Sequence, residues 1–185
     1  FKQKTAYEIS LGLVGSEMCI RDRSEGRKEL ANIALMHPNT YVAQTTCAHF
    51  NHFYRAIMDA NEHDGPAVVV AYTTCQPEHG VADNASMHQA RLAVDSRAFP
   101  LMIYDPNKGT TIKERLSLKG NPSVKDDWYT IRKTDETVDF LTFARSEGRF
   151  GKHFDKDDNP SPAILASQEE RLKNWHLLQE LAGIK

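Results

Sequence analysis

Residues 65–80 read GPAVVVAYTTCQPEHG, and this stretch determines the expected fold. Its centre is an unbroken apolar run from Ala67 to Tyr72, bounded by a Gly-Pro pair and by two threonines. A continuous apolar run of strand length is typical of a strand that is covered on both faces in a parallel sheet. In parallel α/β sheets the chemistry lies at the carboxyl ends of the strands, so residues 73–83 are the first place to search for a site.

Two further strands and two helices are predicted around this central strand. Residues 40–46 (TYVAQTT) are rich in strand-forming residues, and residues 100–104 (PLMIY) form a third short apolar run. Residues 83–98 are expected to be helical, and so is the segment before His63. In that segment the apolar residues have the spacing of one buried helix face: Phe50, Phe53, Tyr54, Ile57 and Met58. This order of strands and helices predicts a βαβαβ unit with a parallel sheet, and therefore the α/β class.

The C-terminal part of the chain is expected to form a polar excursion followed by helices. Residues 108–132 are polar and predict an irregular stretch with a short hairpin. Residues 138–154 have apolar residues at helical spacing interrupted by a glycine, which predicts either one helix or two short ones. The pair Ser161-Pro162 predicts the start of a long helix, with a capping side chain and then proline at the first helical position. That helix has the apolar stripe Leu172, Trp175, Leu178 and Leu181, and the terminating glycine Gly183.

Composition excludes several protein classes. The 185 residues include 25 acidic and 23 basic side chains, a net charge of −2, which argues against a nucleic-acid binder with a basic surface stripe. No apolar run approaches the roughly 20 residues of a transmembrane helix, so no membrane association is expected. The odd count of three cysteines does not fit a disulfide-rich scaffold and suits a reducing cytoplasm, which is the expected location.

Residues 2–23 (KQKTAYEISLGLVGSEMCIRDR) are interpreted as a sequence of non-biological origin. The codons of a sequencing flow-cell primer encode the first part of this stretch, and those of a transposase end sequence encode the last part in the same reading frame. The alternative is a genuine amphipathic N-terminal segment. We expect residues 1–23 to have no native partner in the fold, and the native chain to begin near residue 24 with its own N-terminus missing.

Cys75 is the main candidate for chemistry, in the segment that follows the central strand. A thiolate at a strand end can bind a metal or cluster iron, or act as a nucleophile. His79, four residues further on, could assist it. The alternative is a small buried cysteine that only fills the core.

A second group, Cys47, His49 and His52, superficially resembles a metal site. Without a second CxxC pair the zinc interpretation is weak, and the alternative is a strand-end cysteine followed by histidines on a helix surface. The motifs GxGxxG and GxSxG and the Walker loop are absent from the sequence.

Five stretches within residues 26–106 together form a specific pattern. They are GRKELA at 26–31, YVA at 41–43, GPAVVVAYTTC at 65–75 with the glycine at position 80, AV at 93–94 and FPLMIYDP at 99–106. This pattern resembles the C-terminal end of pyruvate:ferredoxin (flavodoxin) oxidoreductases. The resemblance implies that residues 24–106 are the last part of a thiamine-diphosphate-binding α/β domain, a partial fold. Residues 107–185 would be an excursion and helical extension of the same domain.

In that family the cysteine of the AYxxC motif is the fourth thiolate of the 4Fe–4S cluster nearest the thiamine. The resemblance therefore implies that Cys75 is a cluster ligand. The other three cysteines, and the GDG and NTGG motifs that bind the diphosphate and the magnesium ion, are absent from this sequence. The implied enzyme uses thiamine diphosphate, Mg²⁺ and 4Fe–4S clusters, and this chain alone would be an inactive fragment of it.

The implied reaction is oxidative decarboxylation of a 2-oxoacid such as pyruvate, with transfer of the acyl group to coenzyme A. The implied partners are ferredoxin or flavodoxin as the electron acceptor, the remainder of the same polypeptide, and a second copy in a homodimer. Two alternatives remain open. One is a cluster-free thiamine enzyme, such as a decarboxylase or synthase, and the other is a non-catalytic interaction module that docks through the helix containing Trp175.

Overall fold

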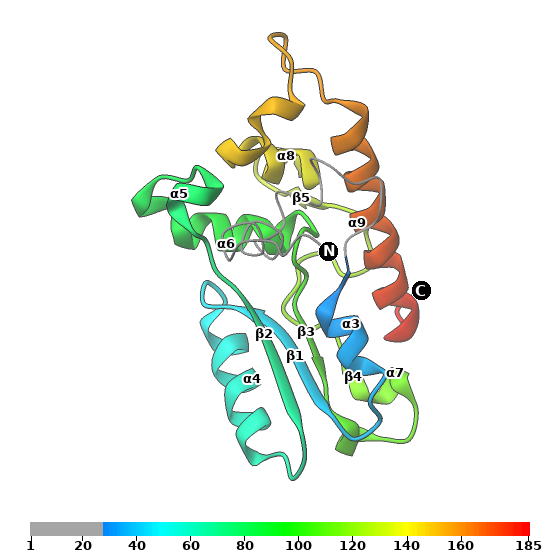
Figure 1. Ribbon diagram of the computed structural model, residues 1–185. Helices are drawn as coiled ribbons and strands as arrows, with labels where there is room; N and C mark the ends of the chain where they lie inside the picture. Colours follow the sequence, from blue (N-terminus) through cyan, green and yellow to red (C-terminus); the bar gives the residue numbers. More distant parts are fainter. Residues whose placement is uncertain (1–27) are drawn as a thin grey trace, which may run out of the picture.

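The structure is a computed structural model that describes residues 28–185. The interpretation of residues 2–23 as a foreign sequence lies outside these described residues. Along the chain the elements occur in this order (Figure 1): α3 (Leu30–Leu35), β1 (Tyr41–Thr46), α4 (Phe50–Glu62), β2 (Ala67–Tyr72), α5 (Gln76–His79), the 3-10 helix η1 (Asp83–Ala85), α6 (Ser86–Asp95), β3 (Met102–Tyr104), the 3-10 helix η2 (Pro106–Lys108), α7 (Ile112–Arg115), β4 (Leu116–Ser117), β5 (Tyr129–Ile131), β6 (Glu136–Val138), α8 (Phe140–Arg145), the 3-10 helix η3 (Gly148–His153) and α9 (Pro162–Leu181).

The apolar strand β2 pairs in parallel with β1 along its whole length. Tyr41 lies opposite Ala67, and Thr46 lies opposite Tyr72. The helix α4 connects the two strands and packs on β1, so the predicted β–α–β unit is confirmed, and with it the α/β class. The sheet has the order β2-β1-β3-β4, which makes the fully buried β1 an inner strand and β2 an edge strand. The residues of β2 are exposed or only partly buried, so the prediction of a central strand covered on both faces is wrong.

The third strand differs from the prediction of a parallel sheet. β3 runs antiparallel to β1, with Val42 opposite Tyr104 and Gln44 opposite Met102. A parallel strand would require the preceding helix to return the chain to the opposite end of the sheet. Instead, α6 lies across the end at which β1 and β2 finish (Figure 1), and residues 96–101 lead into β3 from that same end.

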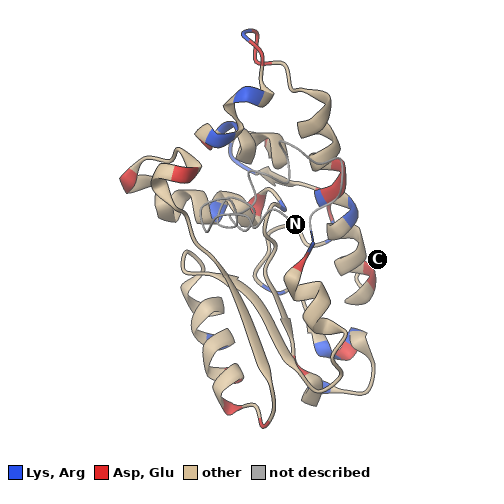
Figure 2. Cartoon of the chain, viewed as in Figure 1, with Lys and Arg blue, Asp and Glu red and all other residues tan. Residues whose placement is uncertain are grey.

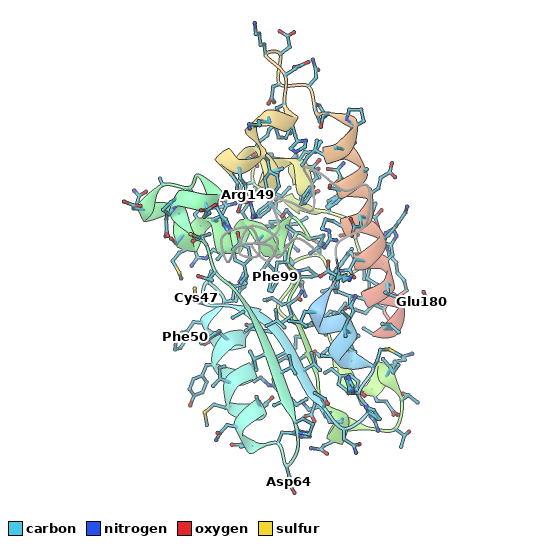
Figure 3. All side chains as sticks on the ribbon, viewed as in Figure 1. Cys47, Phe50, Asp64, Phe99, Arg149 and Glu180 are labelled. Atoms are coloured by element: carbon cyan, nitrogen blue, oxygen red, sulfur yellow. The ribbon has the colours of Figure 1, made fainter. Side chains whose placement is uncertain are left out.

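The prediction that α4 buries its large apolar residues is wrong for four of the five, since only Phe53 is partly buried. Their exposed fractions are 71% for Phe50, 58% for Tyr54, 42% for Ile57 and 39% for Met58. The side of α4 that faces the sheet contains alanines instead, and Ala56 is fully buried against Tyr41. Because small side chains bring the helix close to the sheet, the large residues remain on the outer side, where Figure 3 shows Phe50 projecting outward.

The segment after β3 returns to the sheet and then continues as short elements. β4 pairs with β3, and the hairpin β5–β6 forms slightly later than the predicted 108–132. Residues 138–154 form two short helices, α8 and η3, which is one of the two predicted alternatives. α9 begins and ends as predicted, because the Ser161 hydroxyl accepts a hydrogen bond from the backbone N–H of Ile164 at 3.4 Å and Gly183 has a φ of 64°.

The helix α9 covers the sheet and closes the largest core. Trp175 and Leu178 are 0% and 1% exposed and pack with Met102 of β3, which confirms the predicted burial of the α9 stripe. The first helix of residues 28–185, α3, joins the same core. Its Asn32 Nδ2 donates a hydrogen bond to the Asn174 Oδ1 of α9 at 2.8 Å, so the two ends of the described chain lie side by side.

Charged side chains are absent from the two parallel strands. Figure 2 shows Lys, Arg, Asp and Glu on the helices and loops, whereas β1 and β2 are free of them. The edge strand β2 is therefore an uncharged edge. In residues 28–185, every helix is too short or too polar to cross a bilayer.

Candidate functional site

The ends of β1 and β2 define the candidate site. Because the strands are parallel and Thr46 lies opposite Tyr72, the segments that follow them begin at the same edge of the sheet. Cys47 follows β1 directly, and Cys75 follows β2 after two threonines. Both cysteines are exposed, so this edge of the sheet presents two accessible thiols.

Cys75 is the N-cap residue of α5, a single helical turn. Its carbonyl oxygen accepts a hydrogen bond from the backbone N–H of His79 at 2.8 Å. Pro77 is compatible with this turn because the first N–H groups of a helix have no partner within the helix. Since the thiol is exposed, the alternative of a buried core cysteine is wrong.

Gly80 brings the end of this turn into backbone contact with η3. Its φ of 62° is in the left-handed region, and its carbonyl oxygen accepts a hydrogen bond from the N–H of Gly148 at 3.3 Å. A Cβ added at Gly80 would lie 2.8 Å from the Gly148 Cα. A side chain at this position is therefore excluded by its backbone conformation and by the contact.

Gly80→Ala is expected to lower the free energy of unfolding by about 1–2 kcal/mol or more, because an L-residue resists the left-handed region and its Cβ would displace Gly148. The matched control is Gly151→Ala, since a Cβ there meets nothing within 4 Å. We expect the control to change stability by no more than about 0.5 kcal/mol. Urea unfolding of both variants measures the difference, and equal stabilities would contradict the contact.

The second candidate group, Cys47, His49 and His52, lies around the end of β1. The His52 Nδ1 is 2.9 Å from the Thr45 Oγ1. Burial, together with the neighbouring His49 and Arg55, lowers the pKa of His52 to about 4, so this imidazole is neutral at pH 7. Within residues 28–185, no three side chains of His, Cys, Asp or Glu are placed to hold a metal ion.

Comparison with known proteins identifies relatives of this chain. No protein-family model matches it. It is 29% identical over 160 residues to the pyruvate-flavodoxin oxidoreductase of Rhodospirillum rubrum, an alignment covering 85% of this chain and 12% of that protein. It is 31% identical over 160 residues to the pyruvate:ferredoxin oxidoreductase of Moorella thermoacetica, covering 83% and 12%. The ketoisovalerate oxidoreductase subunit VorB of Pyrococcus horikoshii is 25% identical over 158 residues, covering 85% and 43%.

The chain is a homologue of pyruvate:ferredoxin and pyruvate:flavodoxin oxidoreductases. The resemblance that was inferred from five short stretches is thereby confirmed. The matches support an oxidoreductase over both alternatives, the cluster-free thiamine enzyme and the interaction module. The chain spans only 12% of the length of the pyruvate oxidoreductases that it matches.

A buried glutamate near the candidate site, Glu147, was not predicted from the sequence. Glu147, just before η3, has a side chain that is 0% exposed, and its Oε1 accepts a hydrogen bond from the Tyr72 hydroxyl at 3.0 Å. Tyr72 is the last residue of β2 and lies three positions before Cys75. A glutamate in a polar stretch normally indicates a solvated side chain, so no local signal in the sequence identifies it.

Proposed function

We propose that this chain supplies one ligand to an iron–sulfur cluster of a 2-oxoacid oxidoreductase. The enzyme would oxidatively decarboxylate pyruvate, transfer the acyl group to coenzyme A and pass the electrons to ferredoxin or flavodoxin. The observation that carries the proposal is Cys75, an exposed thiol just beyond the carboxyl end of a parallel strand, within a motif that resembles the family's cluster-ligand motif. Homology to pyruvate oxidoreductases over most of the chain supports it.

The described residues contain too few cysteines to bind a cluster alone. Residues 28–185 contain two free cysteines, Cys47 and Cys75, whereas a 4Fe–4S cluster takes four thiolates. We assign only Cys75 as a ligand, because it alone lies in the motif that resembles the cluster-ligand motif. The exposed sulfur of Cys75 is accessible to iron that three cysteines from elsewhere in the enzyme would hold. When bound, the cluster would carry single electrons toward the acceptor protein. The task of this chain is to hold the thiolate in place at the edge of the sheet.

Thiamine diphosphate and Mg²⁺ belong to the proposed enzyme as a whole, and we assign no residue of this chain to them. In this proposal residues 24–106 are the last part of the thiamine-diphosphate-binding domain, and residues 107–185 extend the same domain. Two contacts support the assignment of both segments to one domain. β4 pairs with β3, and the α9 residue Trp175 packs in the core that β1 and β3 line.

Two neighbouring surfaces support a contact with the remainder of the same polypeptide. β2 is an uncharged edge strand, and such edges are normally paired, charged or covered. The adjacent helix α4 exposes large apolar side chains, which monomeric proteins rarely gather on one face. The chain corresponds to 12% of the length of the two pyruvate oxidoreductases, so in a proposed enzyme of that length other segments would be available to cover both surfaces.

Tyr54→Ser is expected to change the stability of the 185-residue chain by no more than about 0.5 kcal/mol, because Tyr54 is 58% exposed. In the full-length enzyme the ring would be buried, and its loss would cost about 2 kcal/mol. That loss lowers the melting temperature by about 4–8 °C in a domain of this size. Differential scanning calorimetry of both proteins measures the two effects.

The matched control for this substitution is Asn61→Ser, an exposed polar position on the same helix, which is expected to be neutral in both proteins. Equal, small effects of Tyr54→Ser in the chain and in the full-length enzyme would contradict the contact with the remaining polypeptide. If the chain alone forms a dimer that Tyr54→Ser dissociates, the face instead binds a second copy.

The full-length protein encoded at the source locus, purified without oxygen, tests the proposed function. We expect reduction of ferredoxin or flavodoxin that requires both pyruvate and coenzyme A and that releases carbon dioxide. Decarboxylation without reduction of either carrier would identify a cluster-free thiamine enzyme. No reaction with any of a panel of 2-oxoacids would favour the interaction module.

A further inference from the structure

We propose that Glu147 is the positioning residue for Cys75. Its buried carboxylate would hold the segments on both sides of the cysteine and thereby fix the place and the surroundings of the sulfur. This inference rests on the proposed role of Cys75 as a cluster ligand. It adds to that role a second residue, far away in the sequence, through which the protein sets the properties of the cluster.

One oxygen atom of Glu147 lies against both flanks of Cys75. The Tyr72 hydroxyl, three residues before the cysteine, donates a hydrogen bond to the Glu147 Oε1 at 3.0 Å. The Nδ1 of His79, four residues after the cysteine, lies 3.7 Å from the same oxygen. One carboxylate therefore contacts residues on both sides of Cys75, Tyr72 before it and His79 after it.

Glu147 is itself held by side chains from other elements. The Gln89 amide of α6 donates to the Glu147 Oε1 at 3.1 Å, and the Arg149 Nε lies 2.5 Å from Oε2. The Ser146 hydroxyl oxygen lies 3.0 Å from the side-chain Oε1 of Gln89. Figure 3 shows Arg149 near the junction of α6 with α8. A carboxylate without solvent contact is costly to bury unless it is paired and hydrogen-bonded, so these partners make the charge tolerable in the core.

A backbone hydrogen bond also connects the segment of Glu147 to the segment of Cys75. Directly after Glu147, the N–H of Gly148 donates to the carbonyl oxygen of Gly80, which ends the turn containing Cys75. The end of β2, α5, α6 and the start of η3 thus meet around a single carboxylate. A substitution that weakens the contacts of the Glu147 carboxylate would therefore make the α5 turn after Cys75 more mobile, while Cys75 itself stays in the chain.

The potential of an iron–sulfur cluster depends on nearby charge and on the hydrogen bonds and geometry around its ligands. Glu147 contributes a negative charge close to the ligand segment and fixes that segment. Glu147→Gln keeps the shape of the side chain but removes the negative charge that faces the Arg149 guanidinium. A residue that only filled space would not change the potential when it is replaced by its amide.

Glu147→Gln in the full-length enzyme tests the inference by two measurements. We expect backbone hydrogen exchange of residues 73–80 to become about tenfold faster, the scale of a lost hydrogen bond to a charged group, while exchange in β1 stays unchanged. We also expect a shifted midpoint potential and an altered paramagnetic resonance spectrum of the cluster. Tyr72→Phe, which removes one hydroxyl and leaves the carboxylate, should change exchange in the same direction but less.

The matched control is Glu180→Gln, the same loss of charge at an exposed position on α9, which Figure 3 shows far from Arg149. We expect it to alter neither measurement. If Glu147→Gln changes neither the exchange of residues 73–80 nor the potential, the inference is overturned. If Glu147→Gln does not fold, the exchange of residues 73–80 in Tyr72→Phe decides, and an unchanged rate overturns the inference.

The proposed function and this inference fail in different ways. Loss of the cluster in Cys75→Ala together with an unaffected Glu147→Gln enzyme would keep the function and overturn the inference. Full iron content in Cys75→Ala would overturn the cluster assignment and, with it, the positioning of a ligand. Hydrogen exchange would then still report whether Glu147 holds the segment.

Discussion

Cys75→Ala in the full-length enzyme is expected to remove or destabilise the iron–sulfur cluster and to abolish ferredoxin reduction, while thiamine diphosphate binding largely persists. A 4Fe–4S cluster takes four thiolates, and alanine at this exposed strand-end position offers no replacement ligand. Iron quantification, paramagnetic resonance of the purified variant and a ferredoxin-reduction assay measure the effect.

The control for this experiment is Cys47→Ala, because Cys47 is also exposed and follows the neighbouring strand β1. We expect the control to retain its iron and its activity. A full complement of iron with normal ferredoxin reduction in Cys75→Ala would mean that Cys75 is not a ligand, and the site assignment would then be withdrawn.

Trp175→Ala is expected to lower the free energy of unfolding of the chain by about 3–5 kcal/mol. The indole is 0% exposed, and its Nε1 donates a hydrogen bond to the Asp126 carbonyl oxygen at 2.9 Å. The guanidinium of Arg97 lies 4.2 Å from the ring centre. Burial lowers the pKa of Arg97 to about 10, so it stays charged at pH 7 and loses this partner when the ring is removed.

Leu177→Ala provides the matched control on the same helix. Leu177 is 43% exposed, so its truncation is expected to cost no more than about 0.5 kcal/mol. Denaturant unfolding compares the two variants. A negligible cost for Trp175→Ala would contradict the packing of α9 on the sheet and would return the Trp175 helix to consideration as a docking surface.

Some parts of the fold could be predicted because their signals are local. The apolar run of β2 and the Ser161-Pro162 start of α9 each lie within a few residues, and the structure confirms the strand and the helix start. The position of β2 at the edge of the sheet depends on distant segments and was predicted wrongly. The direction of β3 depends instead on where α6 lies, which the sequence PLMIY does not encode. The spacing of apolar residues on α4 likewise predicts an apolar face, but it does not reveal which side of the helix meets the sheet.

In the candidate site, too, the residue with a local sequence signal could be predicted and the residue that depends on a distant contact could not. Cys75 could be proposed as a site residue because the motif and the strand end are adjacent in the sequence. Glu147 could not be, because it reaches Tyr72 across 75 positions and only the folded chain brings the two together. Its neighbours in the sequence are polar, and a polar stretch predicts a solvated surface rather than a buried network.

The contact between α3 and α9 determines when the domain can fold during synthesis. Asn32 and Asn174 are 142 positions apart, and the core that holds Trp175 stays open until the ribosome has released residues 162–181. Contacts between such distant residues form slowly, and exposed apolar strands aggregate readily in the meantime. A nascent chain of this protein therefore exposes β2 and one side of this core until α9 emerges.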